Sequence, residues 1–395
     1  MSVEARLDAQ PSAELRSGGV RFRDGVPFAL GVFICIRLVL SLTGVGTVGT
    51  VQPPSDATAG GEVSAEPGWH NAFDGTDRWD SVWFERIAAE GYDATDASAA
   101  FFPGYPLSIR AVMTVTPLEP FAAATLVSNA AFIGALIVLY ALTVREYDTA
   151  RARRTLVLLA CFPASFFFLA PYSESLFLLA SLLGFWWARS ERWGRAGAAG
   201  IVAALTRSVG ILLVPALVVE AWQRGDERRR WRRVALACLP VLAVIGVGLY
   251  WGIRSGDVLR PLHAQDAWMR SFLPFPVTIG RGVVLGVQGV GDPRGIYWTA
   301  DLLLTTLLVA PLVVRWRSIP TPYLVYAASS MLVVLSYPLP ARPMLSDPRL
   351  LLVAFPAFWA MADIFRGRVF LVAAVTFAIG FIAISSAFMN WGFVF

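Results

Sequence analysis

Carboxylates are concentrated in one stretch of the chain, positions 51 to 100, where ten Asp and Glu residues stand against only Arg78 and Arg86. Asp80 is the best placed of them for chemistry, because it follows Trp79 and precedes further aromatic residues. A partly desolvated carboxylate that a nearby arginine keeps ionised can act as a general base toward a substrate hydroxyl. The alternative is that Asp80 only caps a helix, which is a common role for Asp.

A short amphipathic helix is predicted to carry Asp80 near its N-terminus. Residues 78–92 have the helical spacing of apolar and polar positions, and Gly91 is a typical stop signal. We expect this helix to lie at the membrane interface. The residues expected to share its main face are Trp79, Val82, Trp83, Ile87 and Glu90.

The next segment, residues 100–107, combines aromatic side chains with proline and glycine. It is too interrupted for a helix and too aromatic for a solvated loop, so we expect it to pack against another part of the protein. It is either a structural elbow or a wall of the binding site. Phe102 and Tyr105 are the side chains that would form such a wall.

Arg207 is a candidate for binding an anion at membrane depth. It lies in the apolar segment 196–222, which has arginine clusters on both flanks and so conflicts with the positive-inside rule for a single crossing. A re-entrant hairpin that turns at residues 206–210 resolves the conflict, and such broken helices line polar cavities. One long tilted helix is the alternative. An arginine at this depth is costly without a function or a carboxylate partner, for which Glu174 is the candidate.

The composition indicates that these residues are positioned by membrane helices. The chain has 395 residues, of which 56% are hydrophobic and 15% charged, and a mean hydropathy of +0.59. All 33 basic residues are arginines, a usage typical of GC-rich bacterial genomes. The net charge of +5 does not indicate nucleic-acid binding, because the arginines cluster beside apolar segments, where they orient helices.

The pattern of apolar segments predicts an all-α polytopic membrane protein of about eleven helices, counting the hairpin as two short ones. Residues 1–26 are expected to form a disordered cytoplasmic tail, and residues 27–395 a single transmembrane domain. The arginine clusters place loops 48–120, 255–296 and 339–348 outside the cell. The expected apolar segments are 27–47, 121–144, 155–171, 174–188, 196–222, 234–254, 297–315, 320–338, 349–364 and 369–389.

Neither the cysteines nor the histidines have the spacing of a metal site or a disulfide. Cys35, Cys161 and Cys238 all fall in apolar segments, and His263 with Asp266 provides too few ligands. We therefore expect no metal and no cofactor.

Three ordered motifs resemble the PIG-V family of GPI-anchor mannosyltransferases, which has bacterial relatives. The first is Trp79-Asp80 followed by Gly91-Tyr92 and the aromatic segment 100–107. The second runs from Pro163-Ala164-Ser165 to Tyr172-Ser173-Glu174-Ser175, and the third is Thr206-Arg207-Ser208 with Gly210. A late stretch, Asp347-Pro348-Arg349 with Pro356 and Trp359, is similar to the arginine-containing motif of that family.

The resemblance implies a GT-C glycosyltransferase fold with a catalytic acid in the first extracytoplasmic loop, at the position of Asp80. It also implies inversion at the anomeric carbon and a polyprenyl-phosphate sugar donor, usually mannose. Arg207 and Arg349 are the predicted ligands of the donor phosphate, although snorkelling to the interface would equally explain Arg349. The residues predicted to position the substrate are Trp79, Glu174, Tyr172, Phe102 and Tyr105.

The predicted protein therefore lies in the plasma membrane, with its N-terminus in the cytoplasm and its active site outside. The acceptor is a glycan, a lipid-linked glycan or a protein, and the partners are the donor lipid and the bilayer, without nucleic acid. A flippase of lipid-linked sugars is the alternative function, since it would also have broken helices and outer arginines. A non-catalytic scaffold with the same fold is a third possibility.

Overall fold

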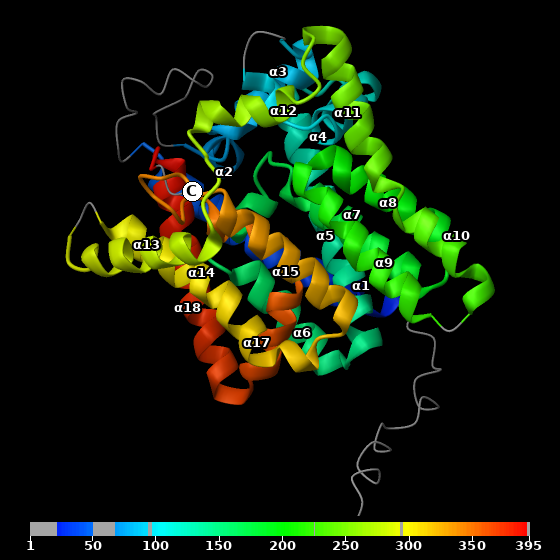
Figure 1. Ribbon diagram of the computed structural model, residues 1–395. Helices are drawn as coiled ribbons and strands as arrows, with labels where there is room; N and C mark the ends of the chain where they lie inside the picture. Colours follow the sequence, from blue (N-terminus) through cyan, green and yellow to red (C-terminus); the bar gives the residue numbers. More distant parts are fainter. Residues whose placement is uncertain (1–21, 50–67, 94–96, 225, 293–294, 393–395) are drawn as a thin grey trace, which may run out of the picture.

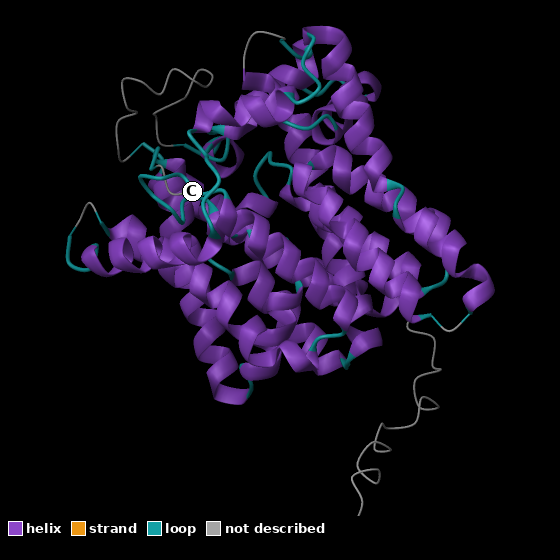
Figure 2. Ribbon diagram, in the orientation of Figure 1, coloured by secondary structure: helices purple, strands orange, loops and turns teal. Residues whose placement is uncertain are grey.

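The computed structural model describes residues 22–49, 68–93, 97–224, 226–292 and 295–392, and in these ranges the regular structure is helical (Figure 1 and Figure 2). The α-helices are α1 (Phe22–Thr47), α2 (Asn71–Asp74), α3 (Asp80–Glu90), α4 (Gly104–Val115), α5 (Pro120–Glu146), α6 (Thr149–Cys161), α7 (Glu174–Arg189), α8 (Trp193–Thr206), α9 (Leu213–Gln223), α10 (Glu227–Ala237), α11 (Pro240–Ser255), α12 (Arg260–His263), α13 (Phe275–Gln288), α14 (Ile296–Arg315), α15 (Thr321–Ser336), α16 (Asp347–Leu350), α17 (Pro356–Ile364) and α18 (Gly367–Met389). The short 3-10 helices are η3 (Ala97–Ala100), η4 (Ser165–Phe168), η5 (Ser208–Leu212), η6 (Ala264–Trp268) and η7 (Trp316–Ser318).

Five helical stretches of the described chain are long and apolar enough to cross a membrane: Gly25–Thr47, Pro120–Glu146, Glu227–Ser255, Ile296–Ser318 and Gly367–Met389. Shorter apolar helices cover Ser208–Gln223 and Thr321–Ser336. Large apolar side chains such as Leu42 on α1 and Val372 on α18 are exposed, as expected where a helix faces lipid. The prediction of an all-α polytopic membrane protein is confirmed.

Ion pairs gather the arginine clusters at one end of the helix bundle. At this end, Arg189 at the end of α7 donates a hydrogen bond to the hydroxyl of Tyr323 at the start of α15, which links α7 to α15. Helices α6 and α17 lie at this end in Figure 1, and α3, α4 and α12 lie at the opposite end. The pairs are Arg189–Glu146 (2.7 Å), Arg224–Glu191 (3.4 Å), Arg151–Asp363 (3.8 Å), Arg315–Asp363 and Arg366–Asp363.

The apolar segment 196–222 is divided into two helices at the predicted position. Helix α8 ends at Thr206, Arg207 is extended with φ −148° and ψ 144°, and α9 begins after η5. The ion pair between Arg224, which follows α9, and Glu191, which precedes α8, shows that the two helices return to the same end of the bundle. The single long helix is therefore excluded.

The turn of this hairpin depends on two glycines. A Cβ on Gly210 would lie 2.5 Å from backbone atoms of Ala203 and Ala204, and a Cβ on Gly104 would lie 2.8 Å from the backbone of Leu205 and Thr206. Backbone segments can approach this closely only where glycine removes the side chain. The aromatic segment 100–107 thus packs against the hairpin turn, and α4 begins within it at Gly104, although we predicted no helix there.

Several predicted boundaries are wrong. Residues 22–26 begin α1 and do not belong to a tail, whereas residues 1–21 lie outside the described part. The predicted loop 255–296 contains the 14-residue helix α13, where Thr299 of α14 donates to the carbonyl of Gly286 at 2.8 Å. The prediction searched for apolar segments long enough to cross a membrane, about 20 residues, and a 14-residue helix is too short for that criterion. The predicted segment 155–171 is also wrong, because α6 ends at Cys161. Pro163 disfavours a helical backbone at the residue that precedes it.

The predicted main face of α3 is also wrong in part. The buried side chains of this helix are Ser81, Phe84, Ile87 and Ala88, so only Ile87 belongs to both sets. The reason is that α3 packs on protein, with the ring of Phe84 4.9 Å from the ring of Tyr105 in α4. The described part of the first loop, residues 68–93 and 97–120, thus packs as helices that fix the start of α3.

Candidate functional site

Four charged side chains from distant parts of the sequence form one continuous network. Arg349 of α16 donates from Nη1 to Oδ2 of Asp80 at 2.7 Å and from Nε to Oε1 of Glu174 at 2.6 Å. Arg207 reaches the same Oε1 of Glu174 at 2.5 Å and donates to the hydroxyl of Ser173 at 3.2 Å. The structure thus brings together the predicted base and both predicted phosphate ligands, with Glu174 between the two arginines.

Burial distinguishes the roles of these groups. The Glu174 side chain is 0% exposed, whereas Asp80 keeps 23% of its side-chain surface exposed, Arg207 13% and Arg349 10%. A buried carboxylate is costly unless it is paired, and Glu174 has two guanidinium partners. Asp80 is therefore the accessible carboxylate of the network, and Glu174 is the anchor that holds the two arginines.

The contacts of Arg207 and Arg349 decide between the alternatives of an ion pair with Glu174 and snorkelling to the interface. Arg207 does pair with Glu174, so the expected buried pair is present. Arg349 does not snorkel, because it is buried and bound to two carboxylates. Its guanidinium also lies over the rings of Tyr172, at 4.5 Å, and Phe167, at 4.9 Å, which limit its orientation.

Tyr172 and Trp79 connect the network to the backbone of the first loop. The Tyr172 hydroxyl donates to the carbonyl of Arg78 at 2.7 Å, directly before Trp79. Trp79 has φ 58° and ψ −113°, a conformation rare for a bulky residue, and its ring packs 5.9 Å from the ring of Trp391. Trp79 occupies the N-cap position of α3, so Asp80 is the first residue inside the helix, and its carboxylate accepts a hydrogen bond from Arg349.

The arginines expected to keep Asp80 ionised are bound elsewhere. Arg78 donates to the carbonyl of Asp77 at 2.6 Å and lies over the ring of Trp391. Arg86 lies over the ring of Trp83. Sequence proximity favoured these two residues, but the partner of Asp80 is Arg349, which is 269 positions away.

A second carboxyl pair in the same loop is not a candidate base. Burial, with the charge and hydrogen bond of neighbouring Asp77, raises the pKa of Glu85 to about 9. Asp77 accepts a hydrogen bond from Ser81 at 2.8 Å. Glu85 is therefore protonated at neutral pH and cannot accept a further proton.

Asp347 and Arg270 lie beside the network and were not predicted as site residues. Asp347 is fully buried, and within the described structure neither of its carboxylate oxygens has a hydrogen-bond partner. Burial raises the pKa of Asp347 well above its usual range. Arg270 donates to the carbonyls of Tyr337 and Leu345 and interacts electrostatically with Asp347 and Asp80. The Asp-Pro-Arg motif was the only sequence signal for this region.

Phe102 and Tyr105 lie outside these contacts. Tyr105 donates to the carbonyl of Ala124 at 2.9 Å and shares a hydrogen bond with Ser128, and Phe102 packs with Trp251. Both fit the structural elbow, and their role in positioning a substrate stays a prediction. Among the described residues, no group of three or more His, Cys, Asp or Glu side chains could hold a metal ion.

The sequence profile described as Mannosyltransferase (PIG-V) matches residues 32–243, more than half of the chain. The chain belongs to the PIG-V mannosyltransferase family. The matched region includes Asp80, Glu174 and Arg207, whereas Arg349 lies beyond it and joins them only in the folded structure.

Two curated relatives are named GPI mannosyltransferase 2. The protein from Drosophila pseudoobscura pseudoobscura is 36% identical over 249 residues, which are 56% of this chain and 53% of the relative. The protein from Cryptococcus neoformans var. neoformans serotype D (strain JEC21 / ATCC MYA-565) is 29% identical over 160 residues, which are 38% of this chain and 36% of the relative. The match thus spans about half or less of these relatives.

Among solved structures, the chain is similar to the crystal structure of ArnT from Cupriavidus metallidurans bound to undecaprenyl phosphate. The TM-score is 0.49 at 16% identity, over 92% of this chain and 76% of ArnT.

Proposed function

We propose that this PIG-V family protein is an inverting glycosyltransferase that moves a sugar, taken to be mannose, from a polyprenyl phosphate to an acceptor hydroxyl. The observation that carries the proposal is the network in which Asp80, the accessible carboxylate, meets two arginines anchored by Glu174. Family membership and the name of the curated relatives support mannose as the sugar.

In the proposed reaction the acceptor oxygen attacks the anomeric carbon as the bond from that carbon to the phosphate oxygen breaks. Asp80 takes the proton of the acceptor hydroxyl, and the polyprenyl phosphate leaves with the bonding electron pair. Because Arg349 donates a hydrogen bond to Asp80 at 2.7 Å, the arginine holds the carboxylate in one orientation until the acceptor arrives.

The proposed role of Arg207 and Arg349 follows from the charge that develops on the leaving group. The donor phosphodiester carries one negative charge, and the released phosphate monoester carries up to two. Guanidinium groups bind phosphate oxygens in bidentate fashion and stabilise that additional charge. Glu174 holds both arginines in place before the donor binds, so little reorganisation is needed during transfer.

The proposed site faces the outside of the plasma membrane. Glu174 begins α7 and Arg189 ends it, so these two residues lie about 22 Å apart along the helix at about 1.5 Å per residue. The positive-inside rule assigns the arginine end to the cytoplasm. The acceptor on the outer side is a glycan, a lipid-linked glycan or a protein.

The test is transfer by the purified full chain in liposomes that contain labelled polyprenyl-phosphate mannose and a membrane extract as acceptor. We expect the wild type to transfer the label and Asp80→Asn to lose at least about 100-fold of the rate, the low end of what a positioned base contributes. The matched control is Asp74→Asn, an exposed carboxylate of the same loop, which should keep the wild-type rate.

Two outcomes would contradict the proposal. Full activity of Asp80→Asn would remove the general base from the mechanism. Movement of the labelled lipid across the bilayer, without sugar transfer by the wild type, would show a flippase instead.

A further inference from the structure

Arg270 lies beside the network, and the proposed reaction assigns it no role. It stands between η6 and α13, in a stretch without regular structure. The backbone of this stretch is bound to the end of α15. Ser271 donates to the carbonyl of Pro338 at 3.3 Å, and Leu273 donates to the carbonyl of Ser336 at 3.0 Å. In Figure 1 the segment that joins α12 to α13 accordingly passes this end of α15.

Two backbone carbonyls fix the guanidinium group of Arg270. Its Nη1 donates to the carbonyl of Tyr337 at 3.0 Å, and its Nη2 donates to the carbonyl of Leu345 at 3.2 Å. Leu345 lies four residues before Arg349 in the chain. The same short segment therefore holds Arg270 and presents Arg349 to Asp80.

The charge of Arg270 acts on the network but is not paired within it. Arg270 interacts electrostatically with Asp80, Arg349 and Arg207. Among the described residues no carboxylate forms an ion pair with Arg270, whose hydrogen bonds go to the two carbonyls. Arg207 and Arg349, by contrast, both pair with Glu174.

Asp347 is the nearest further carboxyl group, and it does not neutralise Arg270. Its side chain is fully buried, and neither of its oxygens accepts a hydrogen bond from a described residue. Burial raises the pKa of Asp347 well above its usual range, which favours the protonated, uncharged form. The positive charge of Arg270 is therefore left for another partner.

The sum of the charges shows what Arg270 adds to the site. Asp80 and Glu174 carry one negative charge each. Arg207 and Arg349 carry one positive charge each, so the four groups sum to zero. A site with no net charge gives an anionic donor little Coulomb attraction. With Arg270 the site carries one positive charge, which is equal and opposite to the charge of a phosphodiester.

We propose that Arg270 is a third ligand of the donor phosphate and supplies the positive charge that the four-residue network does not have. This role rests on the proposed function, because its ligand is the phosphate of the polyprenyl donor. A guanidinium group held by carbonyls keeps its charge and its remaining N–H donors for phosphate oxygens. The released monoester carries up to two negative charges, so Arg270 also stabilises the leaving group.

The test measures binding of the lipid and not sugar transfer. The unfolding temperature of the full chain in uncharged detergent is recorded with added polyprenyl phosphate, or with the uncharged polyprenol of the same length. A ligand that binds only the folded protein raises this temperature. We expect the wild type to respond to polyprenyl phosphate at lower concentrations than to polyprenol.

Arg270→Gln should increase the polyprenyl phosphate concentration at half-maximal effect by at least about tenfold. Its response to polyprenol should equal that of the wild type, which also shows that the variant is folded. Arg270→Lys keeps the positive charge and should bind polyprenyl phosphate more tightly than Arg270→Gln. Equal responses of Arg270→Gln and the wild type to polyprenyl phosphate would overturn the role of Arg270 and leave the proposed function standing.

Arg254→Gln is the matched control for the loss of one positive charge. Arg254 ends α11 and also donates to a backbone carbonyl, that of Tyr92, but it is exposed. This variant should keep the wild-type response, and an equal loss would assign the effect to general charge attraction and overturn the proposal.

Two further results bear on the charge balance. Asp347→Asn replaces one uncharged group by another and should keep the wild-type affinity for polyprenyl phosphate. Tighter binding by Asp347→Asn would show that Asp347 is ionised and neutralises Arg270, which overturns the proposal. A wild type that responds no better to polyprenyl phosphate than to polyprenol would contradict both the role of Arg270 and the proposed donor.

Discussion

At the residue scale, the network is organised around Glu174, which is fully buried between two guanidinium groups. The opposite end of the bundle has a comparable group, Glu220, which is buried between Arg189, at 3.4 Å, and Arg224, at 2.5 Å. Removal of one partner from a buried ion pair leaves uncompensated charge and costs about 3–5 kcal/mol. The two glutamates therefore provide a matched comparison of stability with function.

Glu174→Gln and Glu220→Gln should both lower the unfolding temperature, because each leaves two arginines without their shared carboxylate. Only Glu174→Gln should also reduce sugar transfer per folded molecule, by about 100-fold, since Arg207 and Arg349 lose their alignment. Thermal unfolding and transfer assays on both variants check this. An equal loss of transfer in Glu220→Gln would assign the effect to stability alone.

Glu85 should make the stability of the protein depend on pH. The pKa of Glu85 is raised from 4.5 to about 9 in the folded state, so the folded protein holds a proton that the unfolded chain releases. Its contribution to stability is therefore complete below pH 4.5 and is lost as the pH rises toward about 9. Glu85→Gln should flatten the decline of the unfolding temperature over this window.

The control for this prediction is Glu90→Gln at the exposed end of the same helix, which should keep the wild-type dependence on pH. If Glu85→Gln and the wild type declined in parallel from pH 5 to pH 9, Glu85 would not be the responsible group.

At the element scale, the position of Arg207 depends on the break between α8 and η5. Its extended backbone directs the guanidinium toward Glu174, and the turn is held by close backbone contacts at Gly104 and Gly210. Hairpins of this kind at membrane depth need polar surroundings, which the network provides.

Gly210→Ala should displace this turn, because the added Cβ would lie 2.5 Å from backbone atoms that cannot rotate away. We expect a loss of about 1–3 kcal/mol in stability and lower transfer activity. Gly246→Ala in α11 is the control, since a Cβ there meets no atom within 4 Å and alanine favours a helix. Unfolding temperature and transfer rate are the measurements, and wild-type values for Gly210→Ala would contradict the proposed constraint.

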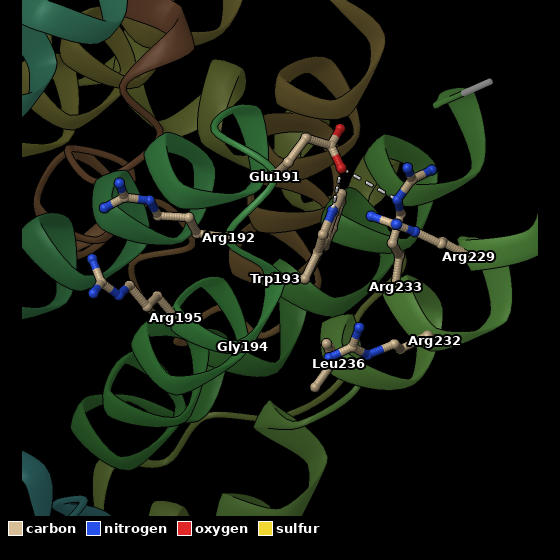
Figure 3. Close-up of a pocket in the computed structure, with 9 residues that line it drawn as sticks. All are labelled: Glu191, Arg192, Trp193, Gly194, Arg195, Arg229, Arg232, Arg233 and Leu236. Atoms are coloured by element: carbon tan, nitrogen blue, oxygen red, sulfur yellow. Dashed lines mark hydrogen bonds and ion pairs between the residues drawn. The ribbon is translucent and has the colours of Figure 1, made fainter. Parts of the chain in front are cut away.

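At the scale of the whole molecule, the two ends of the bundle have different chemistry. One end carries the network of Asp80, Arg349, Glu174 and Arg207, and the other carries the paired arginine clusters and a cavity that residues of the start of α8 and of α10 line (Figure 3). If the arginine end is cytoplasmic, the network lies outside the cell, and the proposed sugar transfer takes place there.

This orientation predicts a labelling pattern in intact cells. In a chain whose Cys35, Cys161 and Cys238 are replaced by Ala, Met269→Cys should react with a membrane-impermeant maleimide, because Met269 is exposed at the end of the bundle that carries the network. Glu227→Cys, at the start of α10, should react only after permeabilisation. The reverse pattern would place the network in the cytoplasm.

The sequence by itself determined the class of protein, the approximate helices and the break near Arg207, and it indicated Asp80 as the candidate base, a role that stays a prediction. These features depend on local signals, namely the length of apolar runs, the position of arginines and short motifs. The tertiary structure decided which groups meet, because ion pairing across 269 positions depends on how the helices pack. For this reason Arg349, rather than Arg78 or Arg86, is the partner of Asp80, and arginines from α8 and α10 that had only indicated orientation form a cavity.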